Sequence, residues 1–243
     1  MILAVNIGNT NIRVALGDLQ AVFYSIYPMD EAFVIAQIEE GLGADVWGKV
    51  EDSIIATVVP AHTDIVKSAI RRKTGLEARR VDIQNCGTLN ISHYQGLLGE
   101  DRVVCCAYAL QKFTPPFIVI DYGTATTINV VNGTGEFMGG AILTGLQTGL
   151  EALTRNTAQL PSIDFKEDIP LIGRNTVENL RVGAVVGLAC STGGYIRRIE
   201  QAMACSLLVI VTGGHAPIIL PHCDFDYKYE PSLLLDGLLA LYG

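Results

Sequence analysis

One pattern of residues occurs twice in this chain of 243 residues. In each copy an apolar, strand-like run reaches an amide or carboxylate, then glycine, then small hydroxyl residues, before a second apolar run follows. The copies span residues 3–14 and 119–130. Glycine permits a tight turn and lets backbone N–H groups approach an anion that a Cβ atom would hold away. The two hairpins therefore predict two related halves that bind one phosphate-bearing ligand, a nucleotide, in the cleft between them.

The rest of the chain alternates strand-like and helix-like segments. We expect helices over residues 30–40, 63–75 (with Thr63 as its cap), 102–112, 148–159 and 231–241, a long helix from 175, and strands over 53–59, 117–131 (a hairpin), 137–142 and 207–211. This order predicts an α/β protein with duplicated mixed sheets flanked by helices. The segment Thr114-Pro115-Pro116 is the best linker, so the predicted halves are residues 1–115 and 116–243.

Two further segments have an unusual composition. Residues 82–99 are irregular and rich in Asn, Gly, Ser and Gln, which makes them a candidate substrate loop containing His93 and Tyr94. Each glycine in a helix interior costs about 1 kcal/mol. Several glycines in the long helix therefore predict that it packs very closely against a neighbour, and a second copy of the chain is one candidate. They are Gly183, Gly187, Gly193 and Gly194.

The overall composition argues against several classes of protein. A net charge of −8 makes nucleic acid an unfavourable partner. No apolar stretch approaches the roughly 18 residues of a membrane span, and no basic segment follows Met1, so we expect neither a membrane protein nor a signal peptide. The six cysteines lack C-x-x-C and metal-finger spacing. They are best explained as reduced thiols of a cytoplasmic protein.

A series of short motifs runs in order along the chain. They are Ile7-Gly8-Asn9-Thr10, Val58-Val59-Pro60, Gly99-Glu100-Asp101-Arg102, Asp121-Tyr122-Gly123-Thr124-Ala125-Thr126-Thr127, Gly139-Gly140-Ala141-Ile142, Thr157-Ala158-Gln159-Leu160-Pro161, Gly173-Arg174-Asn175-Thr176, Thr212-Gly213-Gly214-His215-Ala216-Pro217 and Leu235-Asp236-Gly237-Leu238. With this ordered set the chain resembles the type III pantothenate kinases of the actin and sugar-kinase superfamily. The resemblance implies two ribonuclease H-like halves, a cleft between them and a dimer helix in the second half.

The resemblance also implies a reaction and the residues that perform it. The γ-phosphate of ATP would pass to the primary hydroxyl of pantothenate, the first step toward coenzyme A, in a homodimer that needs Mg²⁺ and a monovalent cation, K⁺ or NH₄⁺. Asp101 would be the base facing the hydroxyl, and Asp121 would hold the monovalent cation. Pantothenate contacts would come from Gly99, Glu100, Asp101, Arg102 and Thr176. ATP contacts would come from Asn6, Ile7, Gly8, Asn9, Thr10, Asn11, Ile12, Arg13, Gly123, Thr124, Gly213 and Gly214.

The same residues allow plainer interpretations. A carboxylate beside an arginine suits a general base, and Arg102 is expected either to lower the pKa of Asp101 or to bind a substrate carboxylate. Asp101 is equally well explained as a helix N-cap, and the Asp101–Arg102 pair as a surface ion pair. Likewise, Asn175-Thr176 is explained by the start of a helix, and Gly213-Gly214 by a tight turn after a strand.

Position 6 departs from the family pattern. The family carries aspartate there, where its charge helps to hold the Mg²⁺–phosphate unit, whereas this chain has Asn6. An amide keeps an acceptor oxygen but lacks the charge that a hard divalent cation prefers. Asn129 and the segment 85–90 also depart from the family. Three hypotheses follow: a slow pantothenate kinase, a silent paralogue that binds nucleotide or pantothenate in a regulatory role, and a kinase for another small hydroxylated acid.

Overall fold

The computed structural model describes residues 1–25, 28–155, 163, 165 and 169–243. The chain forms two compact units. Unit 1 consists of Met1–Phe113, Gly135–Phe137 and Ser232–Gly243, and unit 2 consists of Thr114–Thr134 and Met138–Pro231. The expected halves, 1–115 and 116–243, differ from these units mainly at the C-terminus, because the last helix packs within unit 1.

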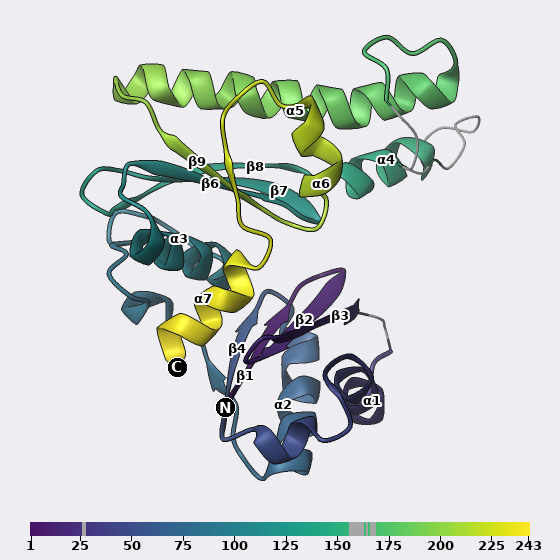
Figure 1. Cartoon of the computed structure of the whole chain (residues 1–243), viewed down its shortest axis with the longest axis vertical. Coiled ribbons are helices and arrows are strands. Elements are labelled where there is room, and N and C mark those ends of the chain that lie inside the picture. Colours follow the sequence, from purple (N-terminus) through teal and green to yellow (C-terminus); the bar gives the residue numbers. More distant parts are fainter. Residues whose placement is uncertain (26–27, 156–162, 164, 166–168) are drawn as a thin grey trace. The chain divides into compact units, whose positions relative to one another are not determined.

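Unit 1 is built on a mixed sheet of five strands in the order β3-β2-β1-β4-β5 (Figure 1). The strands are β1 Ile2–Ile7, β2 Asn11–Leu16, β3 Leu19–Tyr24, β4 Asp52–Thr57 and β5 Arg79–Arg80. The first three form an antiparallel meander, and β4 and β5 continue the sheet in parallel with β1. In β1 the partner of Ile7 is Ile12 on one side and Thr57 on the other, so the first glycine turn lies beside the end of β4.

Helices cover both faces of this sheet, because its strands carry apolar residues on each face. One face packs against α1 Glu31–Leu42 and α2 Pro60–Thr74, in a core that includes Val5, Ile7 and Ile38. The helices α3 Glu100–Lys112 and α7 Leu233–Tyr242 pack against each other, α3 against β4, and α7 against β1 (Figure 1). Short 3-10 turns occur at Val46–Lys49 and Ile83–Asn85. The expected irregular segment 82–99 is confirmed apart from this second turn.

Unit 2 repeats the same sheet with the order β10-β9-β6-β7-β8. Its strands are β6 Phe117–Tyr122, β7 Ala125–Val131, β8 Phe137–Thr144, β9 Leu208–Thr212 and β10 Lys228–Tyr229, the first residue of β8 being counted with unit 1. Its helices are α4 Leu146–Arg155, α5 Thr176–Met203 and α6 Ala216–Ile219, with a 3-10 turn at Leu220–His222. Listed from the meander strand at the edge, the two sheets have the same arrangement, β3-β2-β1-β4-β5 and β8-β7-β6-β9-β10. This shared order confirms the predicted duplication.

Most helix ends lie where the sequence predicts them. Asp30 caps α1 through a bond from the Phe33 N–H to its carboxylate (2.8 Å), and Asn175 caps α5 through the Glu178 N–H (3.0 Å). The predicted cap at Thr63 is wrong. The helix α2 already begins at Pro60, whose missing N–H costs nothing in a first turn, and the Thr63 hydroxyl donates instead to the Val59 carbonyl at 3.0 Å.

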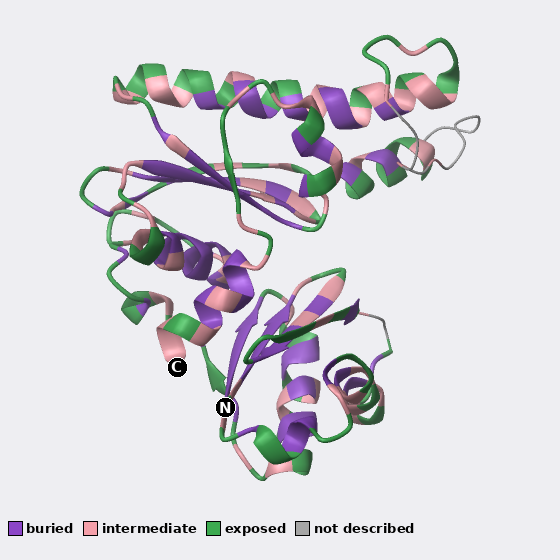
Figure 2. Ribbon diagram, in the orientation of Figure 1, coloured by how far each residue is buried: buried purple, intermediate pink, exposed green. Residues whose placement is uncertain are grey.

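The predicted end of the helix at Gln159 and the motif at residues 157–161 lie outside the described residues. Within the described residues, buried side chains gather on the strands of both sheets (Figure 2). No helix among them combines the length and the apolar character needed to cross a bilayer. The expected tight packing of the α5 glycines is found at Gly193, where a Cβ atom would lie 2.5 Å from the Asp224 carboxylate. At Gly183 and Gly194 a Cβ atom would meet nothing within 4 Å.

Candidate functional site

The first glycine turn joins β1 to β2 in unit 1. The Gly8 N–H donates to the Asn11 carbonyl at 2.9 Å, and a Cβ atom at Gly8 would lie 3.0 Å from that oxygen. Asn9 and Thr10 lie exposed at the tip of the turn. The Ser25 N–H donates to the Thr10 carbonyl at 2.8 Å and ties the tip to the end of β3.

Asn6 and Arg13 are direct cross-strand partners at the base of this turn. Their neighbours Val5, Ile7 and Ile12 belong to the core under α1 and α2. Successive strand residues point to opposite faces, so Asn6 and Arg13 share the other face. Asn6 is buried and Arg13 half-buried. The turn therefore carries a neutral amide beside a guanidinium, a combination that suits an anion better than a cation.

The second glycine turn joins β6 to β7 in unit 2. The Gly123 N–H donates to the Ala125 carbonyl at 3.2 Å, and the partner of Asp121 across the strands is Thr127. Gly213 at the end of β9 has φ +102°, and a Cβ atom there would overlap the Asp121 carboxylate. Only glycine lets this backbone approach the acid so closely. The turn thus places a carboxylate where the first turn places an amide.

Other residues of unit 2 hold the carbonyl groups of the second turn. The Thr148 hydroxyl donates to the Thr124 carbonyl at 2.7 Å, and His215 Nδ1 lies 3.3 Å from the Gly123 carbonyl oxygen. A Cβ atom at Gly145 would overlap both of these carbonyl oxygens. The turn is therefore a fixed backbone structure. The predicted Gly214 is exposed directly after Gly213.

Asp101 lies in the first turn of α3, in unit 1. The interpretation of Asp101 as N-cap is wrong, because the helix begins at Glu100 and Gly99 occupies the cap position. The Asp101 carboxylate accepts a hydrogen bond from the Arg102 N–H at 2.8 Å. Burial raises the pKa of the Asp101 carboxyl above its ordinary value, and the Arg102 backbone N–H and guanidinium oppose this only in part. Arg102 thus lowers the pKa of Asp101 as expected, but burial outweighs it and the net shift is upward.

Arg102 is buried between aromatic rings. Its guanidinium carbon lies 5.9 Å from the centre of the Tyr94 ring and 5.4 Å from that of Phe137, and the two rings meet edge to face at 5.3 Å. A buried arginine held by aromatic faces is a rigid group that can bind a carboxylate bidentately. The interpretation of Asp101–Arg102 as a surface ion pair is therefore wrong, since Arg102 is 9% exposed.

The irregular segment 82–99 contacts the short stretch 135–137, which is also counted with unit 1. The Asn90 N–H donates to the Gly135 carbonyl at 3.1 Å, and the Phe137 N–H donates to the Asn90 carbonyl at 2.8 Å. His93 Nε2 lies 2.8 Å from the Glu136 carboxylate. These contacts bring Tyr94 and Phe137 to Arg102, so the predicted substrate loop is part of the Asp101 environment.

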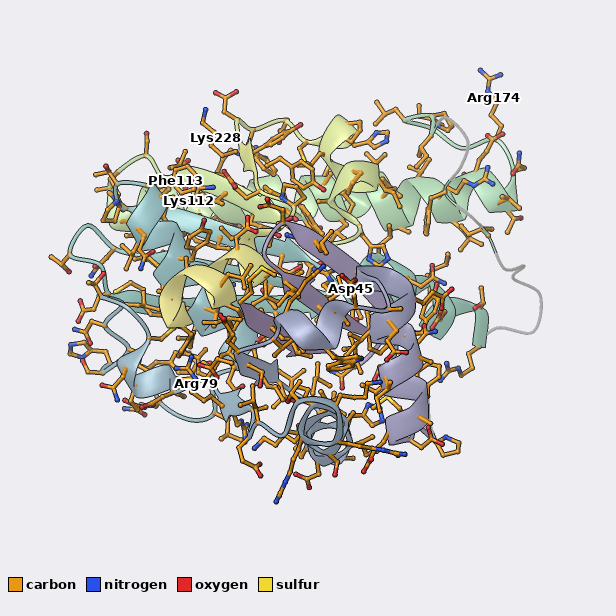
Figure 3. The ribbon with its side chains drawn as sticks, turned by 60° about the horizontal axis from the view of Figure 1, so that its bottom comes forward. Asp45, Arg79, Lys112, Phe113, Arg174 and Lys228 are labelled. Carbon is orange, nitrogen blue, oxygen red and sulfur yellow. The ribbon has the colours of Figure 1, made fainter. Side chains whose placement is uncertain are left out.

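Glu100 does not join the other residues predicted to bind substrate. One carboxylate oxygen accepts from the Thr57 N–H at 2.8 Å, and the other from Arg80 Nε at 2.6 Å. Burial raises the pKa of Glu100, against the lowering effect of these two donors. Thr176, also predicted to bind substrate, is the exposed first residue of α5 in unit 2. Beside it the Arg174 side chain projects away from the ribbon (Figure 3).

The described residues contain no cluster of three or more His, Cys, Asp or Glu side chains that could hold a metal ion. A divalent ion that enters with ATP would therefore depend mainly on phosphate oxygens and water, as Mg²⁺ commonly does. Asn6 can add one amide oxygen. Gly213 and Gly123 pack closely against the Asp121 carboxylate, and a Cβ atom at Gly213 would overlap one of its oxygens.

A family model described as type III pantothenate kinase matches residues 2–198. The chain belongs to this family. A type III pantothenate kinase from Thermus thermophilus is 34% identical over 250 residues, covering 100% of this chain and 98% of the relative. One from Roseiflexus castenholzii is 30% identical over 253 residues, with the same two coverages.

Solved structures show which fold this type III pantothenate kinase family member has. A Baf family transcriptional activator from Campylobacter jejuni matches with a TM-score of 0.62 at 18% identity, covering 98% of this chain and 96% of that chain. A ROK hexokinase from Thermus thermophilus matches with a TM-score of 0.50 at 14% identity, covering 99% and 97%. These likenesses confirm the duplicated ribonuclease H-like fold expected for the actin and sugar-kinase superfamily.

Sequence reasoning missed several residues of the site in this pantothenate kinase family member. The sequence pattern indicates no role for Arg80, and it places Phe137 only in a predicted strand. Both act through partners 20 or more positions away in the sequence. Glu100, the acid directly beside the expected base, was the signal that could have pointed to Arg80. An acid that is buried at such a position needs a cationic partner.

Proposed function

We propose that the protein transfers the γ-phosphate of ATP to the primary hydroxyl of pantothenate, giving phosphopantothenate for coenzyme A synthesis. The observation that carries this proposal is the half-buried Asp101 carboxylate, with its raised pKa, beside the aromatic-held Arg102 in a chain of this family. A base with a pKa nearer to neutrality is better matched to accepting a proton from an alcohol. Arg102 is the matching cation for the pantothenate carboxylate.

The proposed step balances as a direct phosphoryl transfer. The hydroxyl oxygen of pantothenate forms a bond to the γ-phosphorus, the bond between that phosphorus and the β,γ-bridging oxygen breaks, and ADP leaves. Asp101 takes the hydroxyl proton. Phosphoryl transfer requires little covalent help, so positioning by Gly99, Arg102 and Thr176 and exclusion of water are the main contributions expected from the protein.

ATP contacts are proposed separately for each unit. In unit 1 the turn from Asn6 to Arg13 offers backbone N–H groups, short polar side chains and one guanidinium. In unit 2 the contacts are Gly123, Thr124, Gly213 and Gly214, and Asp121 holds the monovalent cation, K⁺ or NH₄⁺. Mg²⁺ bound to ATP neutralises phosphate charge. Asn6, with an amide oxygen only, is expected to support that ion weakly, so we expect slow turnover.

The neutral side chain at position 6 also favours a second candidate function. A chain that keeps both glycine turns and the aromatic-held Arg102 but lacks a strong Mg²⁺ contact would bind nucleotide and pantothenate without turnover, in a regulatory role. A homodimer formed through α5 is part of both candidates, supported by the outward-facing Gly183 and Gly194. A cytoplasmic location is also part of both, because all six cysteines are free thiols.

One assay decides between the two candidates. Purified protein is incubated with ATP, Mg²⁺, K⁺ and pantothenate, and phosphopantothenate is measured by mass spectrometry for the wild type and for Asn6→Asp. The kinase proposal expects product from both and more from the variant. Saturable pantothenate binding by calorimetry, with no product from either protein, would select the regulatory candidate. A parallel panel of small hydroxylated acids, with no pantothenate product, would move the proposal to another substrate.

A further inference from the structure

Glu100 is a buried acid for which the phosphoryl-transfer scheme has no role. It is 7% exposed and lies directly before the proposed base Asp101. Both of its carboxylate oxygens are engaged by protein donors, the Thr57 N–H at 2.8 Å and Arg80 Nε at 2.6 Å. An acid whose two oxygens are held in this way is not available to a substrate. Its role therefore depends on which segments these two hydrogen bonds connect.

The bond to Thr57 reaches the strand that flanks the first glycine turn. Thr57 is the last residue of β4 and the strand partner of Ile7, which directly precedes Gly8. The Val58 N–H donates to the Ile7 carbonyl at 3.1 Å and continues this contact beyond the strand. A short chain of hydrogen bonds therefore runs from the glycine turn, through the end of β4, to the first turn of α3.

The start of α3 lacks a side-chain N-cap. Gly99 at the cap position has no side chain with which to cap the helix. A larger residue there would displace the Asp101 carboxylate, because a Cβ atom would lie 2.5 Å from it. The Glu100 side chain supplies the missing attachment. Arg80, half-exposed on β5, balances the charge that would otherwise be costly in a buried position.

We infer that Glu100 is a positioning residue: its hydrogen bond from the Thr57 N–H fixes the Asp101 carboxylate relative to the glycine turn at Gly8. This inference rests on the proposed function. Arg80 serves the charge of Glu100 and is dispensable once that charge is removed. A shift of a reacting group by about 1 Å can lower the rate about a hundredfold. The gain in rate from this attachment therefore outweighs the cost of burying the Glu100 carboxylate.

Two double variants separate the attachment from the ion pair. Glu100→Gln with Arg80→Met keeps an acceptor oxygen for the Thr57 N–H, whereas Glu100→Ala with Arg80→Met removes it, and neither contains the ion pair. The first is expected to keep the kcat of the wild type, and the second to lose about a hundredfold in kcat with an unchanged KM for ATP. Activity is divided by the calorimetric stoichiometry of a non-hydrolysable ATP analogue, so a merely unfolded fraction cannot lower it.

Arg79→Gln is the matched control. Arg79 precedes Arg80 on β5, is labelled in Figure 3, and pairs with Asp52 on the sheet at 2.5 Å. Losing this exposed pair is expected to leave kcat unchanged. Equal kcat per binding-competent molecule in the two double variants would overturn the inference, as would a hundredfold loss in both.

Hydrogen exchange tests, independently of turnover, whether Glu100 holds the Thr57 amide. In the variant with Glu100→Ala, the Thr57 amide is expected to exchange about tenfold faster or more, the loss of one hydrogen bond to a charged acceptor. In the variant with Glu100→Gln it is expected to exchange as in the wild type. Unchanged protection in both would refute the attachment. If the wild type makes no phosphopantothenate the proposed function fails, and the exchange result still decides whether Glu100 holds α3.

Discussion

The turns at Gly8 and Gly123 join corresponding strands of two sheets that share one strand order. In both turns the glycine N–H donates to a nearby backbone carbonyl, that of Asn11 in the first and of Ala125 in the second. The charges at their bases differ. The first turn pairs Asn6 with Arg13 across the strands, and the second pairs Asp121 with Thr127.

The backbone is therefore alike at the two turns, and the side chains at their bases determine which charge each turn binds. Duplicated strands supply the same donors at both turns, but an amide beside a guanidinium favours an anion, and a carboxylate beside a hydroxyl favours a cation. The same holds for the helices that follow the last strand of each repeat. The first turn of α3 carries Asp101, whereas α7 begins with a run of leucines and has Asp236 in its first turn.

Replacing Asp101 by Asn tests whether the chemistry belongs to one repeat only. The kcat is expected to fall about a thousandfold, because the proton acceptor is lost while the bond from the Arg102 N–H is kept. The matched variant Asp236→Asn, at the start of α7, is expected to change kcat little. Rates of phosphopantothenate formation check both. A large loss in the α7 variant, or none in the α3 variant, would break the proposed asymmetry.

The raised pKa of Asp101 also gives this substitution a pH signature. A carboxyl group with a raised pKa binds its proton more tightly in the folded protein, so stability falls as pH rises from the ordinary aspartate value to the raised one. The amide introduced by Asp101→Asn does not titrate. This variant is therefore expected to melt above the wild type at neutral pH, and the difference is expected to shrink as pH falls below the ordinary value. Melting curves across this range show the sign directly.

The two repeats also differ in how tightly glycine is required. Gly213 has φ +102° and its Cβ would overlap Asp121, so Gly213→Ala is expected to lower the free energy of unfolding by about 3 kcal/mol. Gly8→Ala brings a Cβ to 3.0 Å from the Asn11 carbonyl without a positive φ and is expected to cost about 1 kcal/mol. Denaturant titrations of both variants measure the difference. Equal costs would show that the backbone packed against Asp121 is no tighter than the first turn.

Local pattern was enough to predict both turns and most of the helix ends, because capping residues and glycines act on neighbours in the sequence. The start of α2 was predicted three residues late, at Thr63, because a threonine is a common N-cap while the first turn of this helix is opened by Pro60. The net upward shift of the Asp101 pKa was not predicted, for another reason. It depends on burial, which is set by segments distant in sequence, as are the partners of Glu100 at positions 57 and 80.

Asn6→Asp makes the first turn resemble the second. The new carboxylate restores a negative group for a hard divalent ion, and kcat is expected to rise about tenfold to a hundredfold. The Mg²⁺ concentration at half-maximal rate is expected to fall as well. Steady-state rates over a Mg²⁺ series check both effects, and Asn129→Asp, a buried position on β7, serves as the control for added charge. An unchanged rate would show that Arg13 neutralises the new charge.

Asp121→Asn makes the converse change and gives the second turn the neutral base of the first. Activation by K⁺ or NH₄⁺ is expected to disappear, with a loss of about tenfold in kcat/KM for ATP, a difference of about 1.4 kcal/mol. Rates in potassium, ammonium and choline salts at one ionic strength measure it. The double variant with Asn6→Asp exchanges the two charges, yet monovalent activation is not expected to follow the carboxylate to position 6, because Arg13 stands opposite. Activation that did follow it would mean that the carboxylate alone, without its cross-strand partner, decides which turn holds the cation.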